Sequence, residues 1–141
     1  IIKAGIVKRD QKERGERALL NFGHTIGHAL EAYAGYGEYT HGEGVAIGMI
    51  GAARLAAELD FVTKNKLKKI EEIIKIYNLP KTFPHRYDKK DLDNIHQLMY
   101  HDKKARKNKL RWILINKIGD AFTYEGIDSN KIVNVLEGLN V

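Results

Sequence analysis

The chain has 141 residues, 43% of them hydrophobic and 30% charged, which is the balance of a single globular domain with its own hydrophobic core. The absence of cysteine excludes disulfides and thiolate metal sites, and with no bilayer-spanning apolar run and no signal-peptide pattern we expect a cytoplasmic protein outside the membrane. Part of the formal charge of +6 lies in KKARKNK, residues 103–109, which suits a small anionic substrate as well as a nucleic acid.

Two helices are expected in the first half of the chain. The first spans residues 16–34, where apolar side chains recur at helical spacing until AGYG ends the helix. The second spans residues 42–59, and its small residues recur four apart, which allows another helix to approach closely. These small residues are Gly44, Gly48, Ala52 and Ala56.

Three further helices and a hairpin are expected in the second half. A helix spanning residues 89–100 follows the proline-containing loop NLPKTFP, and the strand-like runs LRWILI and AFTYEGI flank the turn NKIGD. Asp128 or Ser129 caps the last helix. The fold class is therefore mainly α, with one small antiparallel β-hairpin. Thr63 caps the remaining helix, before NLPKTFP, whose apolar face is expected to hold Leu67, Ile70, Ile73, Ile74 and Tyr77.

The stretch NFGHTIGHALE, residues 21–31, places two histidines on one face of the first helix. His24 and His28 are four residues apart, and Glu31 continues the same stripe. Gly23 and Gly27 run beside them, although glycine inside a helix costs about 1 kcal/mol relative to alanine. Two such glycines indicate that a ligand, a cofactor or another backbone comes close to this surface.

His41 adds a third imidazole, in a loop that we expect to precede the second helix. Imidazoles from a loop and from a helix can converge on one ion, and a zinc site with an open position uses three protein ligands. The grouping favours metal or acid–base chemistry over ordinary surface or core histidines. A zinc-protease helix is excluded, because Thr25 stands where that motif has glutamate. Spacing alone leaves the ligand set open, and Glu43 has the alternative role of stabilising the helix dipole.

Taken together, NFGHTIGHALE and the later HGEGVAIGM, residues 41–49, resemble the C-terminal half of the 3-dehydroquinate synthase family. KRDQKERGERALLNFGH, HDKK and ILINKIGDA fit the same family in the same order, so the resemblance covers essentially the whole chain. It implies a lyase of the shikimate pathway (aromatic amino acid biosynthesis) that converts 3-deoxy-D-arabino-heptulosonate 7-phosphate into 3-dehydroquinate and phosphate. In the implied reaction NAD oxidises a carbinol, phosphate is eliminated, the ketone is reduced back and a carbocycle closes. A divalent metal, zinc or cobalt, holds the oxygens under reaction.

The resemblance also assigns roles to the histidines. His24 and His41 match the family's two histidine ligands of the metal, whereas His28 matches a catalytic histidine beside the substrate that assists proton movement. The third metal ligand of the family is a glutamate in the N-terminal domain. Glu31 stays unassigned, although a carboxylate at such a place can orient a neighbouring imidazole.

Further matches lie on both sides of the histidines. Lys3 and Glu13 match a lysine and a glutamate of the family's catalytic pocket. The resemblance implies that Lys103 or Lys104 pairs with the anionic groups of the substrate, as a point charge can. The positions that match substrate-binding residues are Arg17, Asn21, and either Lys103 or Lys104.

The family's N-terminal half, an α/β domain with a Rossmann-like sheet that binds NAD, has no counterpart in this sequence. The chain holds neither a GxGxxG motif nor an alternating β/α run. We therefore expect residues 1–141 to form a single C-terminal domain that binds metal and substrate. Its expected partners are the N-terminal domain, a phosphorylated sugar acid and, in the full-length protein, a second copy. Alone, the domain is expected neither to turn over substrate nor to hold zinc tightly.

Two other functions compete with this interpretation. The nearer one is another NAD- and metal-dependent sugar-phosphate cyclase, or a polyol dehydrogenase, which would share the histidine ligands and differ in its substrate contacts. The more distant one is a basic helical module that binds nucleic acid or protein, supported by a pI near 9.4 and by KKARKNK. A binding module accounts for neither the glycine pair nor the grouped histidines.

Overall fold

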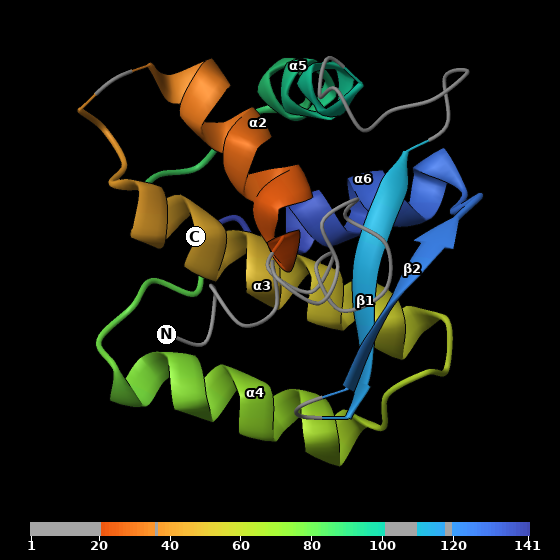
Figure 1. The fold of residues 1–141 in the computed structure, drawn as a ribbon. Helices are drawn as coiled ribbons and strands as arrows, with labels where there is room; N and C mark the ends of the chain where they lie inside the picture. The colour runs from red at the N-terminus through yellow and green to blue at the C-terminus, as the bar shows by residue number, and fades with distance from the viewer. Residues whose placement is uncertain (1–20, 36, 101–109, 118–119) are drawn as a thin grey trace, which may run out of the picture.

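The computed structural model describes residues 21–35, 37–100, 110–117 and 120–141, and in them helices gather around a central helix (Figure 1). This central helix, α3 (His41–Glu58), contacts α2 (His24–Ala34), α4 (Lys64–Ile76), α6 (Ser129–Gly138) and β1 (Arg111–Lys117), while α5 (Lys89–Met99) packs on α2 and α6. β2 (Asp120–Glu125) pairs with β1. The expected fold, mainly α with one hairpin, is confirmed. No helix in these residues is both long and apolar enough to span a membrane.

The centre of the core is α3 itself. Its Ile47, Ile50 and Leu55 are fully buried, and small residues fill most of the remaining helix surface. Thr40 caps the helix: its hydroxyl accepts a hydrogen bond from the backbone N–H of Glu43, and the Glu43 carboxylate accepts one from the backbone N–H of Thr40. This reciprocal pair satisfies donors that the first turn would otherwise leave open.

The crossing of α2 and α3 depends on glycine. A Cβ placed on Gly48 would lie 1.9 Å from the carbonyl oxygen of Gly23, and one placed on Gly27 would lie 3.0 Å from the carbonyl oxygen of Gly44. The small-residue stripe therefore does let another helix approach closely, as predicted. Of the three explanations for Gly23 and Gly27, the approach of another backbone is the one that the structure supports.

Two expected helix boundaries are wrong. The first helix does not run through residues 21–23: α2 begins at His24, because Gly23 takes a left-handed conformation (φ 83°) that a helix cannot contain. His41 is not in a loop, since it is the first residue of α3, directly after the capping residue Thr40. Both differences place an imidazole at the start of a helix, beside a residue that interrupts or caps it.

The expected apolar face of α4 is also partly wrong. Ile70 and Ile74 are buried as predicted, but Ile73 is 41% exposed and Tyr77, the residue at the end of the helix, is 73% exposed. Residues 70 and 74 are one turn apart and face the core, whereas Ile73 lies about 100° around the helix from Ile74. Tyr77 follows the last residue of the helix as its C-cap, beyond the part that packs. The face that packs is therefore narrower than the apolar pattern indicated.

The hairpin and the last helix follow the expected order, and the strand boundaries are shifted: β1 extends to Lys117, and β2 runs from Asp120 to Glu125. β1 and β2 are antiparallel, Trp112 lies opposite Tyr124, and Lys117 lies opposite Asp120, so both of these terminal residues belong to the strands rather than to a turn. Asp128, rather than Ser129, caps α6 by accepting a hydrogen bond from the backbone N–H of Asn130.

Candidate functional site

Three imidazoles meet where α2 and α3 begin. The rings of His24 and His28 are stacked almost parallel, with centroids 4.9 Å apart, as expected for residues one helical turn apart. The His41 ring, from the first residue of α3, lies 5.4 Å from His24 and 5.9 Å from His28. The structure thus brings together all three histidines that the sequence singled out.

Two of these rings are oriented by hydrogen bonds from Nδ1. His24 Nδ1 lies 3.0 Å from the amide oxygen of Asn21, and His41 Nδ1 lies 2.9 Å from a carboxylate oxygen of Glu31. Both oxygens are acceptors, so each ring places its proton on Nδ1 and, when neutral, carries its lone pair on Nε2. Carboxylate and amide partners of this kind are the ones that orient metal-binding histidines.

The donor set fits a divalent transition metal. His28, Glu31 and His41 each offer a ligand atom, and these atoms lie within 4.8 Å of one another. Imidazole nitrogen and carboxylate oxygen are ligands that zinc and cobalt accept, and three protein ligands leave a position for substrate. His28 and His41 are exposed and Glu31 is half-buried, so an ion reaches them from solvent.

Glu43, the other carboxylate in this stretch of sequence, has a structural role. Its carboxylate is engaged with Thr40, and the hydrogen bonds from the Thr40 backbone and hydroxyl lower the pKa of Glu43 below its ordinary value. The helix-stabilising alternative for Glu43 is therefore supported, because the cap that it forms fixes the first turn of α3 and with it the position of His41.

A second set of contacts fixes the segment before His41, and the sequence analysis missed it. The hydroxyl groups of Tyr39 and Tyr87 lie 3.0 Å apart, and His85 Nδ1 lies 3.4 Å from the Glu38 carboxylate. Burial, and then the Tyr87 hydroxyl, raise the pKa of Tyr39 above its usual range, which keeps its hydroxyl protonated. The two segments are 48 residues apart in the Tyr39–Tyr87 pair, so no local pattern could have revealed the contact.

The remaining candidate residues lie outside the described residues. The basic run, residues 103–109, also lies outside the described residues. Asn21 is the one candidate substrate-binding residue that the structure describes, and it contacts His24. The candidates without a described position are Lys3, Glu13, Arg17, Lys103 and Lys104.

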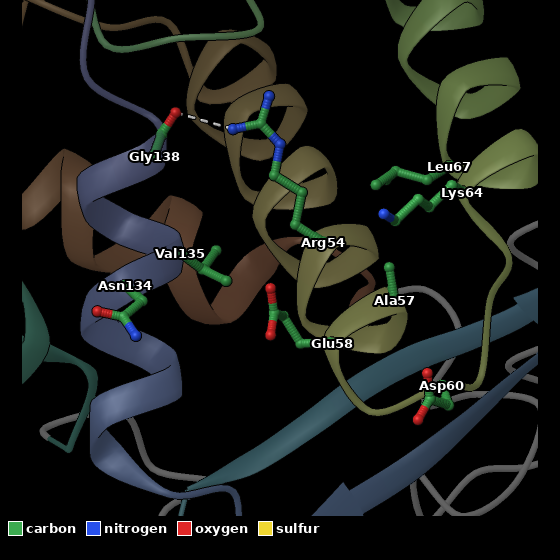
Figure 2. Close-up of a pocket in the computed structure, with 9 residues that line it drawn as sticks. All are labelled: Arg54, Ala57, Glu58, Asp60, Lys64, Leu67, Asn134, Val135 and Gly138. Carbon is green, nitrogen blue, oxygen red and sulfur yellow. Dashed lines mark hydrogen bonds between the residues drawn. The ribbon is translucent and has the colours of Figure 1, made fainter.

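A cavity of about 510 Å³ lies elsewhere, over the C-terminal half of α3 and between α4 and α6 (Figure 2). Arg54 crosses it, with Nε donating to Glu71 over 3.0 Å and Nη1 donating to the carbonyl of Gly138 over 2.9 Å. Because Arg54 is thirteen residues beyond His41 on one helix, the cavity is roughly 20 Å along α3 from the imidazoles. It is therefore separate from the histidine site.

Comparisons with known proteins agree on one family. Residues 1–105 match the family model described as 3-dehydroquinate synthase C-terminal. The 3-dehydroquinate synthase of Acinetobacter baylyi is 45% identical over 126 residues, which are 89% of this chain and 34% of that protein. The enzyme of Desulforamulus reducens is 41% identical over 135 residues, 96% of this chain and 37% of that protein, so the chain spans about a third of the length of these relatives.

Solved structures of related enzymes share the fold. A 2-deoxy-scyllo-inosose synthase, solved with carbaglucose-6-phosphate, NAD+ and Co2+, superposes with a TM-score of 0.80 at 25% identity, covering 96% of this chain and 39% of that one. The 2-epi-5-epi-valiolone synthase of Streptomyces hygroscopicus, solved with NAD+ and Zn2+, gives 0.78 at 22% identity, covering 96% and 36%. By the family model and its relatives, the chain belongs to the 3-dehydroquinate synthase C-terminal family.

Proposed function

We propose that this chain acts as the C-terminal part of a 3-dehydroquinate synthase, which converts 3-deoxy-D-arabino-heptulosonate 7-phosphate into 3-dehydroquinate and phosphate. The observation that carries the proposal is the meeting of His24, His28 and His41 at the start of α2 and α3, in a chain that matches this family over residues 1–105. In this role the chain forms one wall of an active site.

The metal in this proposal is divalent, zinc or cobalt, held by His24 and His41 together with a carboxylate from another part of the enzyme. Two solved structures of similar fold contain Co2+ and Zn2+ respectively, each with NAD+. A bound divalent ion supplies Lewis acidity to the substrate's hydroxyl and carbonyl oxygens. The Asn21 and Glu31 oxygens support this assignment, because they fix the Nδ1 tautomer on which the donor capacity of Nε2 depends.

His28 acts in the proposal as the proton-transfer residue. Its ring is stacked on His24 and exposed to solvent, so a substrate bound at His24 comes within its reach. An imidazole ordinarily titrates near neutral pH, which suits a group that accepts and returns a proton. Lys3, Glu13, Arg17 and one lysine of the pair 103–104 complete the pocket in this proposal.

The partners follow from the same assignment. NAD is held mainly by an N-terminal α/β domain, the substrate is a phosphorylated sugar acid, and the whole enzyme is a homodimer in the cytoplasm. A chain without cysteine is in keeping with a reducing compartment. We expect the chain alone to be inactive.

A chimera tests the function. The segment of the Acinetobacter baylyi enzyme that this chain matches is replaced by the chain, and phosphate release from the heptulosonate phosphate is measured with NAD+ and Co2+. We expect turnover, and a loss of about 10²- to 10⁴-fold when His28 is replaced by Ala, because proton transfer to a positioned base contributes that much. The matched control is Ile76→Lys, on the exposed face of α4, which should leave turnover unchanged.

The same chimera separates the competing enzymes. A folded chimera that cyclises a heptulose phosphate, and leaves the heptulosonate phosphate untouched, would assign the chain to another sugar-phosphate cyclase. A folded chimera inactive on both would contradict the proposal.

A further inference from the structure

A second set of metal ligands, different from the pair that the resemblance implies, lies entirely within this chain. His28 and Glu31 are on α2, His41 is on α3, and their ligand atoms are within 4.8 Å of one another. The pair His24 and His41 needs a carboxylate from another part of the enzyme, whereas this set already contains one. Its two nitrogens and one oxygen make a ligand combination known for zinc sites with an open position.

The backbone holds these three residues in place before any ion binds. His28 and Glu31 are three residues apart on α2 and so share a face. His41 is held by the Thr40 cap at the first residue of α3. The two helices are locked together by their glycine contacts, and a Cβ on Gly44 would lie 3.4 Å from Cγ of Glu31, so the Glu31 side chain lies directly along α3.

Charge and exposure favour the binding of a cation. Glu31 supplies a negative charge between two imidazoles, and its carboxylate already lies 2.9 Å from Nδ1 of His41. The side chains of His41 and Glu31 are 62% and 29% exposed, so an ion can enter without opening the fold and without burying an unpaired charge.

We propose that this chain binds a divalent transition metal unaided, through His28, Glu31 and His41, with Glu31 as a direct ligand. His41 belongs to both ligand sets, so an ion moves from this set to the other while His41 stays bound: it leaves His28 and Glu31 and gains His24 and the carboxylate from another part of the enzyme. The set thus serves as a capture site for the metal of the active site. That role rests on the proposed function, whereas binding itself rests only on the geometry above. This proposal and the expectation that the chain alone does not hold zinc tightly lead to different results in the experiment below.

Metal binding by the 141-residue chain tests the proposal. Co2+ is titrated against the chain and followed by its visible absorption, and Zn2+ affinity is measured by competition with a chromophoric chelator. We expect one ion per chain. His28→Ala and Glu31→Gln should each weaken binding by at least about tenfold, because even outer contacts to a metal ligand are worth that much.

His24→Ala separates the two ligand sets, because only the other set uses His24, and the proposal requires its affinity to stay within about threefold of wild type. Glu72→Gln, at an exposed carboxylate on α4, is the matched control for Glu31→Gln and should leave affinity unchanged. Circular dichroism of every variant shows that the fold is intact. Infrared difference spectra should show the carboxylate band of Glu31 shift when Zn2+ binds, and the shift should be missing in Glu31→Gln.

Three results would overturn the proposal. The first is a wild-type chain that binds neither ion. The second is a tenfold loss in His24→Ala without a loss in His28→Ala, which would assign binding to the other ligand set. The third is an unshifted carboxylate band, which would leave Glu31 as a residue that only orients His41. None of these results depends on turnover. An inactive chimera would therefore count against the proposed function, and a failed metal titration would count against the metal site proposed here.

Discussion

Helices α2 and α4 both pack against α3, on different sides of it, and they do so by different means (Figure 1). The contact with α2 is between backbones, because Gly23 and Gly48 bring the two helices closer than a Cβ would permit, and a Cβ on Gly27 would lie 3.0 Å from the Gly44 carbonyl oxygen. The contact with α4 is between side chains, with Ile70 and Ile74 buried and Leu67 partly buried against the core.

This difference in packing corresponds to a difference in role, because α2 carries residues of the histidine site and α4 does not. Backbone contacts leave little freedom for one helix to shift against the other, so the rings of His24, His28 and His41 keep their spacing. Side-chain packing accommodates changes by choosing other rotamers. We therefore expect substitutions where α2 contacts α3 to be poorly tolerated and to disturb the histidine site. Substitutions in α4 should change stability and leave the positions of the histidines unchanged.

The largest effect is expected from Gly48→Ala. The new Cβ would lie 1.9 Å from the Gly23 carbonyl oxygen, so α2 must move away from α3. We expect a loss of about 3 kcal/mol in the free energy of unfolding, measured with urea, and weaker Co2+ binding by the folded fraction. Gly42→Ala is the control, because nothing lies within 4 Å of a Cβ there. If the Gly48→Ala chain were as stable as wild type, the contact between α2 and α3 would not depend on this glycine, and the contrast with α4 would be wrong.

The next effect is expected from Ile74→Ala in α4. The side chain is buried, and its truncation should cost about 2 kcal/mol while the Co2+ affinity of the folded chain stays unchanged. Ile73→Ala, at an exposed position of the same helix, should cost much less. If Ile74→Ala weakened Co2+ binding as strongly as Gly48→Ala, the two helices would not differ in the way described.

A smaller effect is expected at the caps of α3 and α4, whose contributions to the free energy of unfolding should depend differently on pH. Thr63 caps α4 without an acidic partner in the first turn, so Thr63→Ala should cost about 1 kcal/mol at every pH. Glu43 in the α3 cap titrates, and its pKa is lowered in the folded chain from an ordinary value of 4.5. Its stabilising contribution is therefore present above pH 4.5 and is lost as the pH falls through the folded pKa.

Urea unfolding of the metal-free chain across this pH range checks the sign. Glu43→Gln should be less stable than wild type at pH 7, and the two should converge in acid, while the difference for Thr63→Ala stays constant. A Glu43→Gln difference that grew in acid would show that the pKa of Glu43 is raised rather than lowered.

The smallest effect is expected from Ile76→Lys on the outer face of α4. The side chain is 73% exposed, so the change in unfolding free energy should stay within about 0.5 kcal/mol, and Co2+ binding should be unaffected. A loss comparable with that of Ile74→Ala would mean that this face of α4 is covered in solution.

The sequence by itself determined the helices, the hairpin and the grouping of the histidines, because these are local patterns. His24 and His28 share a face at a spacing of four, and the apolar periods marked α3, α5 and α6 to within a few residues. The resemblance to the family then implied separate roles for the histidines, and these roles stay a prediction. The apolar periodicity predicted too large a buried face for α4, because Ile73 and Tyr77 are apolar or aromatic and yet exposed.

Only the tertiary structure decided how these local pieces meet. It showed that the glycines accommodate α3, that Glu31 reaches His41 across the crossing, and that Tyr39 is held by Tyr87 from a distant segment. It also showed that α2 begins directly after Gly23, whose left-handed backbone is tolerated because glycine lacks a Cβ. Each of these depends on contacts between residues that are far apart in the chain, such as those that set the angle and register at which α2 and α3 cross, and not on any repeat within the sequence.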